Sequence, residues 1–343
     1  MIFDGIRQPN TIYAASVSRG KDSTAMLLAI EKLGFPLDAI YAVDIWATQD
    51  IPAELPPMVA FKDEWDKKCL ERFGIPVTRL CAMRGGRRLS YEDIFYKEVS
   101  PERERERERA AGRWKKVGNT RLYGYPVTLT PWCNGYLKRS ALLDSRLCEE
   151  LGAIPTSRKQ QQDLRFCDTP LPVVQHNSQS QQTRQPHNKP LDEGQKINIV
   201  HYIGIAADEP KRIERWQDRK DKVLPLVQIG WDEATCRKIA EDLGMLSPTY
   251  TTGERDGCWF CHNQGIKQLR RLRKEYPDLW AKLLQWDADS PTTFHADGRT
   301  VHDFDRRFQL EDEGLIDPDE RFKWSMCEEP CRQMNIFDFI KGE

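Results

Sequence analysis

Apolar and polar positions follow two alternating patterns along the first eighty residues. Continuous apolar runs cover residues 12–17, 39–43 and 75–80 and are typical of buried parallel strands. Residues 25–33 and 58–73 lie between them and have the mixed pattern of amphipathic helices. Strands that alternate with helices predict an α/β fold, namely a doubly wound, mainly parallel sheet with helices on both faces.

The second half of the chain predicts one more strand and then helices. An apolar run at residues 197–205 fits another buried strand, and Asp232 begins a helix that Gly244 ends. Helical segments follow at 265–276 and 277–286. The tail after Pro291 is polar and predicts less regular structure.

These patterns divide the chain into two regions. Residues 1–230 form the predicted α/β domain, and residues 231–343 form a smaller, helical C-terminal region with a polar tail. The first region carries a charged insertion near 98–125, which includes a strict Glu-Arg alternation. It also carries an insertion near 156–195, rich in Gln, Asn and Ser, that we expect to be flexible.

Composition sets bounds on location and partners. The net charge of the 343 residues is −1, so any contact with nucleic acid must be local. No apolar run is long enough for a transmembrane helix, and the N-terminus lacks the apolar core of a signal peptide, so we expect a cytoplasmic protein without membrane contact. The ten cysteines are then expected to be thiols or metal ligands rather than disulfides.

A phosphate site is predicted where the first strand gives way to the first helix. The segment reads Ser-Arg-Gly-Lys-Asp-Ser over residues 18–23, with Thr24 next. Backbone N–H groups of such a turn and the positive end of the helix converge on an anion. The residues exclude a Walker A loop, because Asp22 follows Lys21, and they exclude a dinucleotide fingerprint, because only Gly20 is present.

Each residue of this segment has a chemical task in a phosphate loop. Gly20 allows close approach of the backbone, and Lys21 supplies a compact positive charge. Hydroxyl and N–H donors come from Ser18, Ser23 and Thr24. Asp22 would orient Lys21 or hold a magnesium ion. The alternative is an ordinary capped helix start with an incidental lysine.

The segment resembles the pyrophosphate loop, or PP-loop, of the ATP pyrophosphatase superfamily, Ser-Gly-Gly-Lys-Asp-Ser, with Arg19 in place of the first glycine. Arg19 would add a phosphate contact or signal a changed ligand. Three later segments resemble those of the phosphoadenosine phosphosulfate (PAPS) reductase family within that superfamily, in its phage and bacterial branch. They are Trp132-Cys133 with Lys138 and Arg139, the segment 204–209 with Arg212, and the segment 257–261.

The resemblance implies that ATP with Mg²⁺ is cleaved between its α and β phosphates and that a substrate oxygen becomes an adenylate. It also implies nucleotide contacts at two later strand ends. The residues concerned are Asp44, Asp208, Glu209 and Arg212. The alternative for these carboxylates is an ordinary loop or helix start, where acidic residues favour the helix dipole.

Cys258 and Cys261 form a Cys-x-x-Cys pair, a spacing that lets two thiolates reach one metal centre. A redox dithiol and two buried thiols are the alternatives. In iron–sulfur relatives a double cysteine joins this pair to hold a 4Fe-4S cluster, and the resemblance transfers Cys133 from that position. The fourth ligand stays open between Cys81, His262 and a free coordination position. Zn²⁺ or plain packing would satisfy the same residues.

A basic helix is predicted directly after this pair. Its cations are Lys267, Arg270, Arg271, Arg273 and Lys274. With nearby aromatic residues they would bind nucleic-acid phosphates and stack bases. The alternative is a solvated charged face.

The sequence thus predicts an ATP-dependent adenylating enzyme of sulfur metabolism or sulfur transfer. Its substrate would contain or accept sulfur, with thiolation of a nucleic acid or nucleotide as one form. Lys21 and Asp22 would be its catalytic residues. One alternative is a sulfonucleotide reductase, although the Glu-Cys-Gly-Leu-His-like motif of that activity is missing from the sequence. Another is a nucleic-acid-binding or regulatory protein that keeps the nucleotide fold without turnover.

Overall fold

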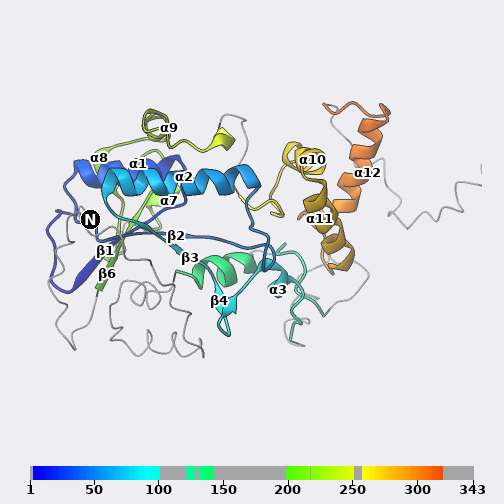
Figure 1. Ribbon diagram of the computed structural model, residues 1–343, viewed down its shortest axis with the longest axis horizontal. Helices are drawn as coiled ribbons and strands as arrows, with labels where there is room; N and C mark the ends of the chain where they lie inside the picture. Colours follow the sequence, from blue (N-terminus) through cyan, green and yellow to red (C-terminus); the bar gives the residue numbers. More distant parts are fainter. Residues whose placement is uncertain are drawn as a thin grey trace, which may run out of the picture.

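The structure is a computed structural model of the chain (Figure 1). It describes residues 3–100, 121–127, 131–142, 198–216, 218–250 and 257–319. The polar insertion near 156–195 lies outside these residues, as does most of the charged insertion near 98–125.

A parallel five-stranded sheet forms the centre of the molecule and confirms the predicted α/β class. Its order is β3-β2-β1-β6-β7. In chain order these strands are β1 (Thr11–Ser16), β2 (Ala39–Val43), β3 (Val77–Leu80), β6 (Asn198–Ile203) and β7 (Lys222–Val223). The chain proceeds from β1 to β2 and β3 on one side and then returns to β6 on the other. The carboxyl end of β1 is therefore a switch point, where ligands bind in sheets of this kind.

One face of the sheet is covered by helices (Figure 1). They are α1 (Lys21–Lys32), α2 (Pro56–Phe73), α8 (Pro225–Ile229) and α9 (Glu233–Asp242). Alternate residues of β1, Tyr13 and Ala15, point to this side and join a core with Met26, Trp65 and Cys236. Both α8 and α9 contact α1, so the predicted domain boundary at 230/231 falls between two helices that pack on the same neighbour.

The opposite face of the sheet is equally apolar. Ile12 and Ala14, the other alternate residues of β1, pack there with Tyr41 and Ile199. Ala141 closes this cluster directly after η1 (Asn134–Arg139), a π-helical turn. Burial on both faces explains why the strands read as continuous apolar runs rather than as alternating ones.

A separate aromatic core lies beyond the carboxyl edge of the sheet. It joins α3 (Tyr91–Phe95) to α10 (Ile266–Glu275), α11 (Pro277–Asp289) and α12 (Val301–Asp312), and Figure 1 shows α10 to α12 grouped at one end. The described part of the tail, residues 292–319, is more regular than predicted: a capping box of Thr300 and Asp303 begins α12, which buries Phe304 and Phe308.

Four short elements complete the described chain: β4 (Met83–Arg84), β5 (Arg87–Arg88), α7 (Pro210–Ile213) and η2 (Pro248–Tyr250). Across the described residues, the helices are all too short or too polar to cross a membrane.

Gly204, directly after β6, lies against the beginning of α1. A Cβ atom added at Gly204 would be 3.1 Å from the backbone oxygen of Asp22 and 3.3 Å from Cα of Ser23. These backbone atoms cannot rotate away, so the absence of a side chain at residue 204 lets the β6 edge approach the predicted phosphate loop.

We predict that Gly204→Ala lowers the free energy of unfolding by about 1–3 kcal/mol, the usual cost of overpacking. Gly135→Ala is the matched control, since an added Cβ there meets no atom within 4 Å. Urea unfolding of both variants measures the difference. Equal stability of Gly204→Ala and the wild type would contradict the close contact.

Candidate functional site

The carboxyl edge of the sheet brings together the residues that the sequence places after its strands. The loop 17–20 follows β1, Asp44 follows β2, Cys81 follows β3, and Asp208 and Glu209 follow β6. Because these strands are parallel, their carboxyl ends lie at one edge.

The predicted phosphate loop has the geometry of a helix N-terminus. Gly20 is the N-cap of α1, and its carbonyl oxygen accepts hydrogen bonds from the Ser23 and Thr24 hydroxyls. Thr24 is fully buried and its hydroxyl also accepts from the Trp65 indole, so it supports the turn from within. The free N–H groups at this helix start remain available to an anion.

Lys21 is held at this helix start by carboxylates. Its Nζ lies 2.7 Å from Asp22 Oδ1 and 3.5 Å from Glu233 Oε2. Burial on its own lowers the pKa of Lys21, but the hydrogen bond and charge of Asp22, with help from Glu233, raise it above the ordinary lysine value. Lys21 is therefore a fixed positive charge, and Asp22 is the group that orients it.

Arg19 adopts the backbone conformation that favours glycine, with φ of 62°. Its side chain is buried and binds Asp66 through Nε and Nη2, at 2.7 and 2.9 Å, and Asp44 through Nη1 at 3.1 Å. The guanidinium is thus occupied by two carboxylates, which leaves the backbone N–H as the group that Arg19 would offer to a phosphate. The glycine-like backbone turn is kept at residue 19, and the additional charge is used inside the protein.

Asp44 links this pair to a second cation. Lys62 Nζ lies 2.7 Å from Asp44 Oδ1 and 2.7 Å from Glu54 Oε1, at the entrance to α2. Burial raises the pKa of Asp44, but Lys62 and Arg19 outweigh it and hold the pKa below its ordinary value. Asp44 is thus an ionised member of a buried chain of charges that runs from Arg19 to Glu54.

The acidic residues after β6 have partners within the protein. Asp208 accepts a hydrogen bond from the backbone N–H of Glu233 at the first turn of α9, and Glu209 binds Arg212 at 2.6 Å. These contacts match the helix-start alternative. The nucleotide contact predicted for the three residues stays a prediction.

Three cysteines converge on the aromatic core. Cys133 is the N-cap of η1, and Cys258 and Cys261 form a tight turn in which the Cys261 N–H donates to the Cys258 carbonyl at 3.0 Å. The pKa of Cys258 is raised to about 12, mainly by burial; Lys138 opposes the rise, and the charges of Glu54, Cys261 and Cys133 add to it. Burial also raises the pKa of Cys133, and the charge of Cys261 is the second cause of the rise.

The segments that carry the three thiols lie side by side, because Trp132, next to Cys133, and Phe260, between Cys258 and Cys261, both pack on the ring of Tyr91. Within the described part of the chain, no group of three or more His, Cys, Asp or Glu side chains is arranged so that it could hold a metal ion. The chemistry of the donors nevertheless fits a thiolate-bound centre: three sulfur atoms, with Lys138 as a nearby cation. Cys133 and Cys258 would lose their protons on binding, because metals bind the thiolate.

The structure does not distinguish between Cys81 and His262 as the fourth ligand. The Cys81 thiol donates to the Met83 sulfur at 3.6 Å. His262 follows the Cys-x-x-Cys turn directly, and burial lowers its pKa, which keeps a neutral imidazole of the kind that binds metals. Cys69 and Cys236 are fully buried in the sheet core, where they pack with its apolar side chains.

The basic helix is α10, and its arginines are paired. Arg270 binds Glu311 and Arg273 binds Asp305 and Asp312, all on α12, while Arg271 binds Glu275 on its own helix. These charges hold α10 against α12, a role that neither sequence alternative included. The structure therefore gives them an intramolecular task, and a nucleic-acid contact through Lys267 and Lys274 stays a prediction.

Several residues of the site escaped the sequence prediction. Asp66 and Lys62 lie on the same helical stripe as Trp65 and Cys69, so polar residues on a buried face were the available signal. Tyr250 was also missed, because no sequence pattern marks it as part of the site. Its hydroxyl would lie 3.7 Å from a Cβ atom added at Gly20.

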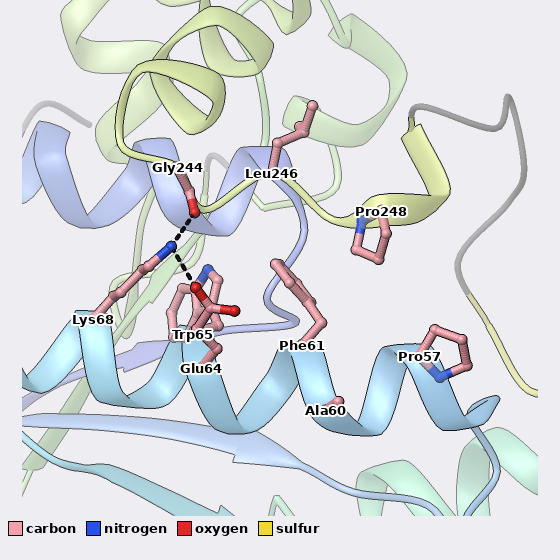
Figure 2. A pocket seen from close by; sticks show the side chains of 9 residues that line it. All are labelled: Pro57, Ala60, Phe61, Glu64, Trp65, Lys68, Gly244, Leu246 and Pro248. Carbon is pink, nitrogen blue, oxygen red and sulfur yellow. Dashed lines mark hydrogen bonds and ion pairs between the residues drawn. The ribbon is translucent and has the colours of Figure 1, made fainter.

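A cavity of about 450 Å³ was also unforeseen. Figure 2 shows it between α2 and the segment 244–248, with Phe61 and Trp65 on one side and Leu246 and Pro248 on the other. Lys68 spans its end, with hydrogen-bond and ion-pair contacts to the Gly244 carbonyl and Glu64. None of the predicted nucleotide-binding residues lines this cavity.

Comparison with known proteins gives a fold neighbour and no family. No protein-family model and no curated protein sequence matches the chain. Among solved structures, a U34-tRNA thiolase, NcsA from Methanococcus maripaludis with its 4Fe-4S cluster, is similar at 14% identity and a TM-score of 0.32. The match covers 89% of this chain and 75% of the thiolase. At this level of similarity the comparison does not carry the thiolase's activity to this chain.

We predict that Arg19→Ala lowers the free energy of unfolding by about 1.5–3 kcal/mol, the range for hydrogen bonds to charged groups. The loss is limited because Asp66 keeps Arg79 and Asp44 keeps Lys62 as a partner. Arg19→Gly, which suits the positive φ, should recover only part of this loss. Arg237→Ala removes an exposed pair with Glu241 and should cost less than about 0.5 kcal/mol. Urea unfolding at neutral pH measures all three. Wild-type stability in Arg19→Gly would show that the buried charges contribute nothing.

Proposed function

We propose that the chain is an ATP pyrophosphatase of the PP-loop type that adenylates its substrate. One observation carries the proposal: Gly20 and Lys21 begin α1 directly after β1, at the switch point of a parallel sheet. A fixed cation, free helix N–H groups and a glycine-like turn at Arg19 meet there. These are the features that a departing pyrophosphate requires.

The reaction follows from these groups. An oxygen of the acceptor attacks the α-phosphorus of ATP, the bond to the α,β-bridging oxygen breaks, and pyrophosphate departs into the loop. Lys21 and the N–H groups stabilise the charge that develops on it, and Asp22 keeps Lys21 in place. Magnesium would neutralise the phosphates when ATP binds. Asp44, Asp208, Glu209 and Arg212, at the same edge, are the proposed surroundings of the nucleotide.

Sulfur transfer is the proposed use of the adenylate. Cys133, Cys258 and Cys261 would hold an iron–sulfur cluster, or a zinc ion in its place, and either fits their sulfur donors. A cluster would supply a sulfur-binding position, and sulfur from a donor would then replace the activated oxygen with release of AMP. The proposed acceptor is a nucleotide or nucleic acid.

The activity test is pyrophosphate release from ATP, with sulfate, RNA, DNA and free nucleotides as acceptors. Lys21→Ala should lower the rate by about 10²–10³-fold, as expected for the loss of one charge-stabilising group. Lys67→Ala, which removes an exposed cation of α2 paired with Glu71, should leave the rate unchanged. ATP binding without pyrophosphate release from any acceptor would favour a nucleotide-binding protein without turnover. Release of sulfite from a sulfonucleotide with a thiol donor would establish a reductase.

The metal test is anaerobic purification followed by a visible spectrum and by assays for iron, sulfide and zinc. We expect iron and sulfide in the wild type and their loss in Cys258→Ser. Cys236→Ala removes a thiol from the sheet core and should keep the metal. Zinc alone would contradict the sulfur-carrying role. A wild type without metal would mean that the three thiols only pack in the core.

A further inference from the structure

The hydroxyl of Tyr91 is buried without a hydrogen-bond partner in the described structure. Tyr91 is the first residue of α3 and is 1% exposed. A hydroxyl left unpaired inside a protein costs about 1–3 kcal/mol, so a buried tyrosine normally finds an acceptor. An isosteric phenylalanine would avoid this cost.

Other polar aromatic groups in the same core are paired. The indole N–H groups of Trp132, Trp259 and Trp286 donate to Gly124 O, Pro52 O and Glu92 Oε1, and the Tyr125 hydroxyl donates to Leu283 O. Among the described indole and hydroxyl groups of this core, the unpaired state of Tyr91 is therefore an exception; a ring nitrogen of His295, which packs on Phe294 and Phe304, is also unpaired.

The surroundings of Tyr91 place its ring among the segments that carry the three cysteines. The ring centroid lies 4.2 Å from that of Phe260, between Cys258 and Cys261 in sequence, and 4.8 Å from that of Trp132, which precedes Cys133. Burial raises the pKa of Tyr91 well above its ordinary value, and the negative charges of Cys133, Cys261 and Cys258 raise it further. Tyr91 thus remains a neutral O–H donor close to all three thiols.

We propose that Tyr91 donates its hydrogen bond to a sulfur atom of the metal centre held by Cys133, Cys258 and Cys261, and so acts as a positioning residue for that centre. The inference rests on the metal centre proposed above. Thiolates and cluster sulfides accept hydrogen bonds, and such bonds raise the reduction potential of a cluster because they stabilise its more negative reduced form. Groups that orient metal ligands in this way also contribute to metal affinity.

The test compares Tyr91→Phe with Tyr125→Phe, which removes a paired hydroxyl from the same core. In Tyr91→Phe, the affinity of the metal-free protein for Zn²⁺, measured by chelator competition, should fall about 10-fold or more. The reduction potential of its reconstituted iron–sulfur cluster should shift to a more negative value. Tyr125→Phe should change neither. The metal-free proteins should show the opposite order: Tyr91→Phe melts no lower than the wild type, and Tyr125→Phe melts lower.

A second measurement compares the metal-loaded wild type with Tyr91→Phe. Resonance Raman spectra of the metal-loaded protein in H₂O and D₂O should show a shift of the metal–sulfur bands, and Tyr91→Phe should lose the shift that its O–H causes. Wild-type metal affinity and cluster potential in Tyr91→Phe would overturn the role of Tyr91 and leave the metal centre intact. A wild type that binds neither zinc nor a cluster would overturn both, while the pyrophosphate assay on the same preparation still tests the loop.

Discussion

The ion pairs of one buried arginine support the whole carboxyl edge of the sheet. Arg19 has the left-handed backbone conformation of a glycine and is bound by Asp66 on α2 and Asp44 after β2. A turn that costs backbone strain is thus tied by charge to the two elements that follow it. The loop after β1, the end of β2 and the middle of α2 hold their relative positions because these three side chains are bound together.

The same network connects the two halves of the proposed chemistry. Asp44 pairs with Lys62, and Lys62 pairs with Glu54. The negative charge of Glu54 in turn raises the pKa of Cys258. The carbonyl of the neighbouring Ala53 accepts a hydrogen bond from the backbone N–H of Trp259, which lies inside the Cys-x-x-Cys turn. The phosphate loop and the thiol pocket therefore share one support, although they belong to segments far apart in the sequence.

The sequence predicted those parts of this arrangement that depend on local patterns. The apolar runs gave β1 and β2, and Asp232 at a helix start gave α9, because burial on both faces and capping leave marks in adjacent residues. The α12 helix was missed although Thr300 and Asp303 carried its signal, since its polar composition concealed the buried positions. The partner of Arg19 is 47 positions away, and no local rule selects Asp66 from the other carboxylates on α2.

The anchoring of Trp259 has a consequence for the order in which the molecule forms. Its indole donates to the Pro52 carbonyl across 207 positions of the chain, and its ring stacks on Trp286 at 5.5 Å. Closing so long a loop is slow and entropically costly, and Cys258, which precedes Trp259, reaches Cys133 only through long-range contacts of this kind. A nascent chain has thus no assembled thiol pocket until its last third has been synthesised, and loading of a metal there would mark a molecule that has finished folding.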